Sequence, residues 1–454
     1  MKDERILLPT FGMSMNGRRA KWLRANFDFY SPSVYRMSGV SECERCCYVI
    51  PKKKRRCKML VKKGSSYCGE HAIYEPSNHE RVPCPLDPKH TVNKSELEEH
   101  MKRRCNWRIP EAPWVVKGLN SSEASCSEVG AGSLGFQRVG KNNLFVSANF
   151  VTMIRKAYEK IQDEVCHSEV KDAVIEEFMR QTDEMNFTHR KHLMQHSSII
   201  GLLVSTGLLY NDSQLCIIDF GSGKAELPYW ISKGFQKCNF LLLDNQGMRN
   251  KYDNKAAKED PMIRMKRIRC SIEHIDLSKI DAVKEAKDVV AICKHLCGKA
   301  TDWGIRCLEN SAKTGVNFSG FALIPCCHHK TVYEEYMGKE FLASNGFRSE
   351  QDFSLLRYVA SWAVCGLLLQ RKTKDEDDKT LKEKPKQNDG SRESGGKLSN
   401  EEREVLGRQA KVLLEFGRAA YLTQIGFEVK LYQYVNSTIS PENLLILGRK
   451  RSFT

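Results

Sequence analysis

Leu215-Cys-Ile-Ile-Asp-Phe-Gly-Ser-Gly-Lys-Ala-Glu226 reads as an apolar strand that runs into a glycine turn and then into a helix. Gly221 and Gly223 permit a tight turn and a close approach of the backbone to a ligand, and the helix start adds exposed N–H groups. A dinucleotide site needs a third glycine where this chain has Glu226. The stretch therefore predicts an α/β ligand-binding fold and disfavours a dinucleotide.

Apolar runs of strand length recur beyond this stretch, and segments of helix length separate most of them. Before it, from Leu144 to about Arg180, apolar residues lie three or four positions apart, which predicts helix. Strands that alternate with helices predict a mostly parallel sheet covered on both faces. The predicted strands are LCIIDF at 215, NFLLLD at 239, RIRCSI at 267, DVVAIC at 288, GFALIP at 320, FEVKLYQYV at 427 and NLLIL at 443.

An acidic residue lies near the end of each of the first two strands, and another follows the third. Asp219-x-Gly221-x-Gly223 resembles motif I of class I S-adenosylmethionine methyltransferases, a short pattern with many chance matches. Asp244, at the end of the second strand, is placed to accept hydrogen bonds from both ribose hydroxyls, or alternatively to cap a helix. Asp276 is a candidate acceptor for an adenine amino group, with a solvated loop acid as the alternative.

Two further motifs lie at the ends of the fourth and fifth strands, where a doubly wound sheet places its ligand crevice. They are CKHLCG at 293–298 and PCCHHK at 325–330. We expect Lys294, His295 and His329 to line the pocket, where a lysine or histidine can relieve a hydroxyl of its proton. The alternative is a third metal site, although the spacing matches no known finger or ribbon. Its ligands would come from Cys293, Cys297, Cys326, Cys327, His328 and His329.

Residues 41–108 hold two sets of four metal ligands at finger-like intervals. A region with so few large apolar residues needs a metal to fold, which predicts two zinc ions. Cys43 and Cys47 compete with Cys46, which we favour because it gives two equal ten-residue intervals. The predicted ligands are Cys46, Cys57, Cys68 and His71 in the first finger (41–74), and Cys84, His90, His100 and Cys105 in the second (80–108).

Positive charge is concentrated in the same region. The 454-residue chain has a formal net charge of +16, and residues 41–110 contribute 16 Lys or Arg against 9 Asp or Glu. Lys52, Lys53, Lys54, Arg55 and Arg56 lie between the first two ligands, with Lys62 and Lys63 in the next loop. This arrangement favours phosphate contacts, and a nuclear localisation signal is the competing explanation for KKKRR.

The remaining segments carry little chemistry. We expect a disordered extension over 1–40, a linker over 109–143 and a disordered charged insertion over 371–400 within a sheet domain spanning 144–454. There is no signal-peptide pattern and no apolar run near 18 residues, which argues against secretion and membrane spanning. Clustered cysteines in a reducing compartment then act as metal ligands, and we expect the nucleus, the cytoplasm or both.

Together these motifs closely resemble the eukaryotic tRNA 2′-O-methyltransferases that modify the fourth nucleotide of the acceptor stem. The resemblance runs from about Cys46 to the C-terminus, with a gap at the charged insertion. PCPLDPKH also resembles the CHHC zinc finger of a spliceosomal protein. The interval between His100 and Cys105 departs from that pattern, with four residues where three is typical. The matching motifs are CGEH, PCPLDPKHTV, KHLMQHSSIIG, DFGSGKAEL, AICKHLCGKATD and PCCHH.

The resemblance implies a class I, Rossmann-like domain with a seven-stranded, mostly parallel sheet, preceded by CCCH and CHHC zinc fingers. It implies S-adenosylmethionine as cofactor, with Asp219, Gly221, Gly223, Asp244 and Asp276 as its candidate contacts. It also implies a tRNA acceptor stem as substrate, with neither DNA nor membrane as partner. Lys294 and His295 are our candidate proton acceptors, or they hold the cofactor or a phosphate instead. A non-catalytic zinc-finger adaptor that binds RNA is the alternative function.

Overall fold

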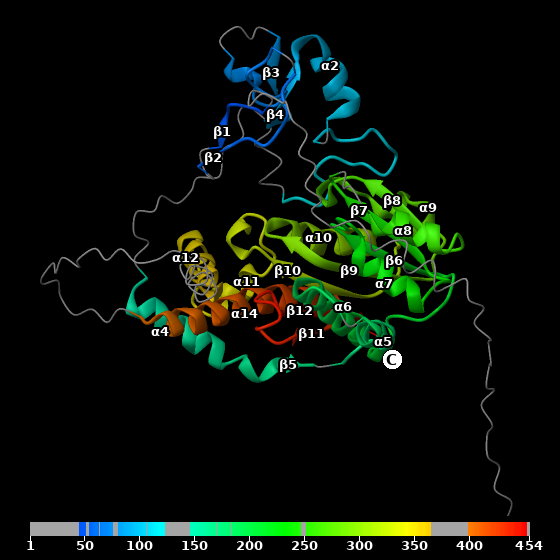
Figure 1. The fold of residues 1–454 in the computed structure, drawn as a ribbon. Helices are drawn as coiled ribbons and strands as arrows, with labels where there is room; N and C mark the ends of the chain where they lie inside the picture. The colour runs from blue at the N-terminus through cyan, green and yellow to red at the C-terminus, as the bar shows by residue number, and fades with distance from the viewer. Residues whose placement is uncertain are drawn as a thin grey trace, which may run out of the picture. The chain divides into compact units, whose positions relative to one another are not determined.

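The computed structural model describes most of the chain and divides it into two units, Met1–Arg103 and Arg104–Thr454 (Figure 1). The predicted extension 1–40 and nearly all of the predicted insertion lie outside the described residues. None of the helices in the described ranges combines the length and the apolar character that a bilayer crossing requires. The described ranges are 45–50, 54–62, 64–75, 80–105, 107–122, 146–168, 170–182, 184–246, 251–364 and 398–451.

The second unit is built on one sheet whose described strands run in the order β5-β11-β12-β10-β9-β6-β7-β8. Only β12 is antiparallel to its neighbours, β10 and β11, and all other pairs are parallel. The prediction of a mostly parallel sheet is therefore confirmed. The strands are β5 (Val165–His167), β6 (Leu215–Phe220), β7 (Asn239–Asp244), β8 (Arg264–Arg269), β9 (Asp288–Cys297), β10 (Phe318–Cys326), β11 (Phe427–Gln433) and β12 (Leu444–Lys450).

The predicted number of seven strands is wrong, because the described part of the chain forms a sheet of eight. The additional strand, β5, contains three residues and pairs with β11 at the sheet edge. A three-residue strand is too short to show an alternating pattern, and it lies within the segment that we predicted to be helical. The third predicted strand is also shifted, since β8 begins at Arg264 rather than Arg267.

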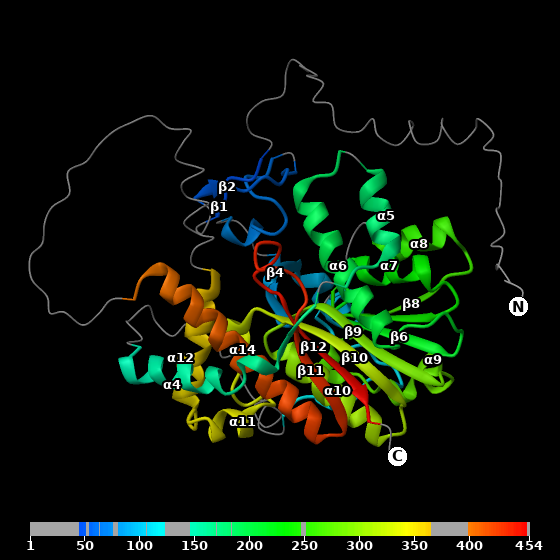
Figure 2. The same ribbon diagram turned by 90° about the horizontal axis from the view of Figure 1, so that it is seen from below.

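Helices cover both faces of the sheet, as the continuous apolar strands require (Figure 2). Successive residues of β6 point to opposite faces. Ile218 belongs to the hydrophobic cluster that includes residues of α4, α10, α12 and α14, while Ile217 belongs to the cluster that includes residues of α5, α6, α7 and α8. The helices are α4 (Ala148–Glu159), α5 (Ala173–Gln181), α6 (Phe187–Ser205), α7 (Glu226–Gly234), α8 (Tyr252–Glu259), α9 (Asp281–Lys284), α10 (Lys299–Lys313), α11 (Lys339–Ser344), α12 (Glu350–Ala360) and α14 (Asn400–Gln424).

The first part of the predicted linker is packed on the sheet domain. Val115 forms a bridge with Ile275, and the buried Asn120 amide donates to the carbonyl oxygens of Ile272 and Ile275 at 2.7 and 2.8 Å. These bonds satisfy backbone acceptors that burial would otherwise leave unpaired. Residues 109–122 are therefore part of the second unit, and the rest of the predicted linker, to residue 143, lies outside the described residues.

The end of the predicted insertion also belongs to a regular element. Ser399 caps α14 in a capping box, because its hydroxyl accepts from the backbone N–H of Glu402 while the Glu402 carboxylate accepts from the backbone N–H of Ser399. A Ser-x-x-Glu pattern is typical of a helix start, and here its serine lies within the segment predicted to be disordered. The prediction of disorder up to residue 400 is therefore wrong at its last residues.

The first unit contains short elements only, as expected of metal-dependent modules. The two halves of this unit are joined by the buried Thr91, whose backbone N–H donates to the Glu70 carboxylate at 3.1 Å and whose hydroxyl donates to the carbonyl oxygen of Gly69 at 2.9 Å. They therefore pack as one body. Its elements are β1 (Val49–Ile50), β2 (Arg55–Arg56), β3 (Arg81–Cys84), β4 (Asp87–Asn93), α2 (Leu97–Glu99) and a π-helical turn over His100–Arg104.

Candidate functional site

The glycine turn after β6 is a rigid cradle. Gly221 and Gly223 have φ values of +69° and +49°, which favour glycine. Arg267 secures the turn by donating to the Ser222 hydroxyl at 2.9 Å and to the Gly223 carbonyl oxygen at 3.1 Å. Arg267 comes from β8, so the strand pattern alone did not reveal its role.

Asp219 and Asp244 have different positions in this cradle. Asp219 is 4% exposed and lies outside the pocket lining, and burial raises its pKa well above the usual range despite nearby Arg267. Asp244 lines the pocket, and its two carboxylate oxygens accept from the backbone N–H groups of Gly223 and Gln246, both at 2.7 Å. Asp244 is therefore held in a fixed orientation beside the turn, whereas Asp219 is buried at the end of β6.

A pocket of about 340 Å³ opens over the carboxyl ends of β6, β7 and β9. Four of the residues predicted from the sequence to form a site line it together: Gly221, Gly223, Asp244 and His295. A Cβ at Gly221 would lie 3.5 Å from Leu296 and narrow this pocket. The remaining lining residues are Leu243, Asn245, Gln246, Cys270, Ser271, Ile272, Leu296, Cys297, Ala300 and Trp303.

The structure does not bring Asp276 to this pocket. Its carboxylate accepts from the backbone N–H and the hydroxyl of Ser278, at 3.1 and 2.5 Å, and pairs with Lys279 at 3.4 Å. Asp276 therefore caps a short 3-10 turn, and Cys270, Ser271 and Ile272 line the pocket in its place. The geometry does not support the predicted contact between Asp276 and adenine.

Lys294 and His295 face different environments because adjacent strand residues point to opposite faces. His295 is exposed and lines the pocket, whereas the Lys294 Nζ lies 3.0 Å from Nε2 of His196 on α6. Burial lowers the pKa of Lys294 to about 8, and the negative charge of Glu226 opposes this shift. Burial also lowers the pKa of His196 well below its usual range, so a neutral His196 accepts a hydrogen bond from Lys294.

The contact between His196 and Lys294 was not predicted from the sequence. His196 lies within the quoted motif KHLMQHSSIIG, to which no role was assigned. His189, His192 and His196 are three and four positions apart, which places them on one face of a helix. His189 in turn lies 3.7 Å from Glu226, the residue that replaces the third glycine. This spacing was the available signal for a polar cluster beside Lys294.

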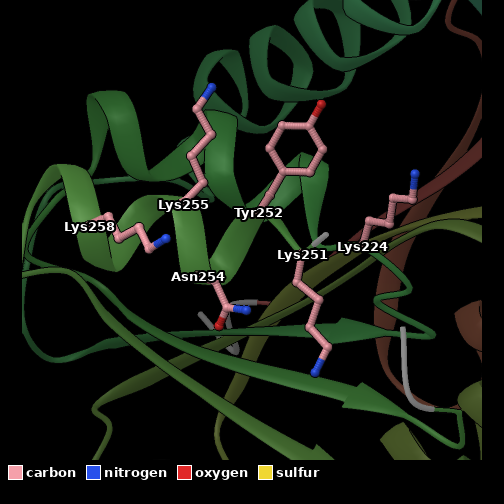
Figure 3. A pocket seen from close by; sticks show the side chains of 6 residues that line it. All are labelled: Lys224, Lys251, Tyr252, Asn254, Lys255 and Lys258. Atoms are coloured by element: carbon pink, nitrogen blue, oxygen red, sulfur yellow. The ribbon is translucent and has the colours of Figure 1, made fainter. Parts of the chain in front are cut away.

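A second, basic cavity of about 590 Å³ lies next to the glycine turn (Figure 3). Lys224 comes from the turn itself, and the other lining residues come from the start and length of α8. The backbone N–H of Tyr252 donates to the Lys224 carbonyl oxygen at 2.8 Å, which joins the two segments. Four lysines around one opening produce a positive potential that favours an anion. The lining residues are Lys224, Lys251, Tyr252, Asn254, Lys255 and Lys258.

The first predicted ligand set converges in the finger unit. The candidate ligand atoms of Cys46, Cys57, Cys68 and His71 all lie within 4.8 Å of one another, and the three cysteines are buried. Tyr48 stacks on His71 with ring centroids 4.0 Å apart, which fixes the imidazole. The competing Cys47 is exposed and outside this set, and Cys43 lies outside the described residues. The donor set and its spacing fit tetrahedral zinc.

The second predicted ligand set converges in the same way. Cys84, His90, His100 and Cys105 offer ligand atoms within 4.8 Å of one another, with the two Nε2 atoms facing each other at 3.0 Å. Asp87 contacts the other ring nitrogen of His90 at 3.4 Å, the arrangement by which carboxylates orient metal-bound histidines. Asp87 is a further residue that the ligand spacing did not reveal.

The unusual interval before Cys105 has a structural explanation. Residues His100–Arg104 form a π-helical turn, in which residues five positions apart lie on one face. His100 and Cys105 are five positions apart, so the wider turn brings both toward the same site. The additional residue in the interval therefore does not remove Cys105 from the ligand set.

This strand order, with a glycine turn after the central strand β6 and a fixed acidic residue after its neighbour β7, defines a class I, Rossmann-like methyltransferase domain. Comparison with known families agrees with this class. The chain belongs to the TRM13 methyltransferase family, because the family model "Methyltransferase TRM13" matches residues 194–449. Models described as "CCCH zinc finger in TRM13 protein" and "U11-48K-like CHHC zinc finger" match residues 44–72 and 81–106.

Curated relatives are similar along nearly their whole length. The human "tRNA:m(4)X modification enzyme TRM13 homolog" is 30% identical over 467 residues, covering 88% of this chain and 94% of the relative. The corresponding Kluyveromyces lactis protein is 30% identical over 459 residues, covering 91% and 98%. Among solved structures, magnesium protoporphyrin IX methyltransferase from Synechocystis with bound SAH matches at 12% identity with a TM-score of 0.29, over 67% of this chain and all of that one. A TM-score this low carries no argument about this chain.

Proposed function

We propose that this protein methylates the ribose 2′-hydroxyl of nucleotide 4 in the tRNA acceptor stem, with S-adenosylmethionine as the methyl donor. The names of the curated relatives support tRNA as the substrate. The observation that carries the proposal is the position of Lys294, a half-buried lysine with a lowered pKa, which directly precedes the pocket-lining His295 on β9 and contacts His196. A site that transfers a methyl group to a hydroxyl needs such a proton acceptor next to the donor.

The pocket residues fit S-adenosylmethionine. Asp244 keeps lone pairs free for ribose hydroxyls while its backbone partners hold it in place. The turn at Gly221 and Gly223 lets the cofactor approach the backbone closely, and the Cys270–Ile272 segment is placed to border the adenine. When bound, the cofactor supplies an activated methyl group on a good leaving group, so the protein mainly has to align the hydroxyl with it.

Lys294 is the proposed proton acceptor, and His196 is the residue that orients it. A neutral lysine amine donates one N–H to the Nε2 of His196 and keeps its lone pair for the incoming hydroxyl. His295 faces the cofactor pocket instead, so we assign it to shaping that pocket. This division refines the prediction that either residue is the base.

The two zinc fingers are proposed to hold the tRNA outside the reaction centre. Lys54, Arg55 and Arg56 are exposed between the first two ligands of the CCCH finger, and Lys62 is exposed in the next loop. A-form RNA hides the base edges in its major groove, so recognition there works through shape, phosphates and 2′-hydroxyls. Zinc at the two ligand sets would make these basic loops rigid enough for such contacts.

The proposed function is tested by incubating the full-length protein with unmodified tRNA and labelled S-adenosylmethionine, followed by mass analysis of the nucleosides. We expect one labelled 2′-O-methylnucleoside at position 4. A label on a base, or at another position, would overturn the proposed specificity. Binding of tRNA without methyl transfer, and without binding of S-adenosylmethionine, would favour the alternative of a non-catalytic RNA-binding adaptor.

Charge reversal in the basic cavity is expected to weaken tRNA binding. With Lys251→Glu and Lys258→Glu combined, we expect tRNA affinity to fall about tenfold, and the slope of log affinity against log salt to flatten by roughly one unit per lost phosphate contact. The affinity for S-adenosylmethionine should stay unchanged, because neither lysine lines that pocket. The measurement is a filter-binding titration at several salt concentrations.

The matched control combines Lys284→Glu with Lys287→Glu. Both lysines are exposed and lie outside the lining of the basic cavity, and the two reversals change the net charge by the same amount as the tested pair. If two such control reversals, Lys284→Glu with Lys287→Glu, weaken tRNA binding equally, the cavity has no specific role and only net charge matters.

A further inference from the structure

Three cysteine sulfurs converge in the second unit, and none of them belongs to either finger ligand set. The Sγ atoms of Cys297, Cys326 and Cys327 all lie within 4.8 Å of one another, as do the ligand atoms of each finger. Cys297 ends β9 and Cys326 ends β10, and the two residues are direct partners in the parallel ladder. Their sulfurs are 3.1 Å apart, closer than two unlinked thiols normally pack and much longer than a disulfide of about 2.05 Å.

The backbone holds these sulfurs in place at a local cost. Cys327 has a φ of +53°, a left-handed conformation that is unfavourable for a non-glycine residue. Gly298 has a φ of +58°, and a Cβ there would lie 2.6 Å from the Lys330 carbonyl oxygen. The backbone N–H of Gly298 donates to the Cys326 carbonyl oxygen at 3.0 Å, which ties the two strand ends together. Strained residues of this kind are concentrated at binding and active sites.

The other candidate ligands that the sequence suggested do not join this set of three cysteines. Cys293 is fully buried, and its sulfur accepts a hydrogen bond from the backbone N–H of Ile324 at 3.3 Å. His328 is buried and lies 2.7 Å from the Glu415 carboxylate, which Arg418 also contacts. His329 is exposed and outside the convergent set. Within the described residues, three cysteines therefore remain as a compact set of soft ligands.

We propose that Cys297, Cys326 and Cys327 bind a third zinc ion, with its fourth position open to water or to an oxygen ligand. Zinc binds thiolates at about 2.3 Å in a tetrahedron, and sites with three protein ligands keep one position for an exchangeable ligand. Because Cys297 also lines the cofactor pocket, the ion would stand at the wall of that pocket.

The test is metal content, measured on the full-length protein purified under reducing conditions in the presence of zinc. We expect three zinc ions per chain, one for each convergent ligand set. The double variant Cys297→Ser/Cys326→Ser should hold two. The matched control Cys166→Ser should hold three, because Cys166 is a partly exposed cysteine on β5 outside every set. Elemental analysis needs neither tRNA nor S-adenosylmethionine, so its result is independent of the proposed function.

Additional variants separate loss of the site from loss of folding. Cys327→Ser alone should also reduce the zinc content to two, and Cys57→Ser combined with it should reduce the content to one. The cooperative thermal transition should remain in each variant. Two zinc ions in the unmodified protein, unchanged in Cys297→Ser/Cys326→Ser, would overturn the proposal. An intact mass two hydrogens below the reduced value, abolished by the same substitutions, would overturn it in favour of a disulfide.

Discussion

Replacing Lys294 with alanine is expected to slow single-turnover methyl transfer by about 10²- to 10³-fold, the usual contribution of a positioned general base. The affinity for S-adenosylmethionine should change less than about threefold, because Lys294 does not line the cofactor pocket and contacts His196. Quenched-flow measurement of the methylated tRNA gives the rate, and a titration without tRNA gives the cofactor affinity.

The pH dependence follows from the lowered pKa. Burial places the pKa of Lys294 at about 8, so the amine is protonated and inactive as a base below that value. The single-turnover rate should therefore rise with pH up to about 8 and then level off. The rise should disappear in Lys294→Ala, because the group that titrates is gone.

Two control variants identify the role of this lysine. Lys294→Arg keeps the positive charge but cannot release a proton at these pH values. If it retains a near-normal rate, Lys294 holds a phosphate or the cofactor, and the assignment as base is wrong. His295→Gln changes the neighbouring residue on the same strand, and we expect it to weaken binding of S-adenosylmethionine more than it slows the transfer step.

Removing residues 1–103 is expected to raise the apparent KM for tRNA on the order of 100-fold while leaving cofactor affinity within about threefold. The deleted unit carries both sets of finger ligands except Cys105, together with the exposed basic loop at Lys54–Arg56. Losing several phosphate contacts at once has an effect of this size at moderate salt. Steady-state kinetics with each substrate varied in turn measures both quantities.

The position of the cut matters. Trp107, Arg108, Ile109 and Pro110 line a small cavity together with residues that also border the cofactor pocket. A cut at residue 110 would therefore damage the methyltransferase unit itself. Equal loss of tRNA and cofactor affinity after the cut at 103 would contradict the proposed division between the two units.

Point variants of the first finger test the same role in tRNA binding without removing the whole first unit. Cys57→Ser removes one zinc ligand and should raise the KM for tRNA, whereas Cys47→Ser should not, because Cys47 is exposed and outside the ligand set. If the two variants behave alike, the metal at this finger has no part in holding tRNA.

Much of the fold could be predicted because the sheet is buried on both faces. Such strands appear as continuous apolar runs, and those at 215, 239, 288 and 320 each correspond to an observed strand. β5 escaped prediction because three residues carry no periodic signal. The ordered packing of residues 109–122 could not be predicted either, because the hydrogen bonds of Asn120 to Ile272 and Ile275 join positions more than 150 residues apart.

The candidate site divides in the same way. Ligands at short sequence intervals, such as Cys68 and His71, and the turn at Gly221 could be placed from local spacing alone. Arg267 and His196 act through contacts with distant strands and turns, which only the folded chain brings together. Asp276 was predicted as a site residue from local sequence alone, but its carboxylate caps a short turn instead.

The π-helical turn at His100–Arg104 bears on how a finger of this type can change during evolution. One inserted residue usually rotates every later side chain of a helix by about 100°, which would carry a cysteine away from its metal. A wider turn absorbs the insertion where it occurs, so the ligand geometry survives a change of length. Related fingers can therefore differ by one residue at this point and still bind the same ion, and a search by fixed ligand spacing would overlook them.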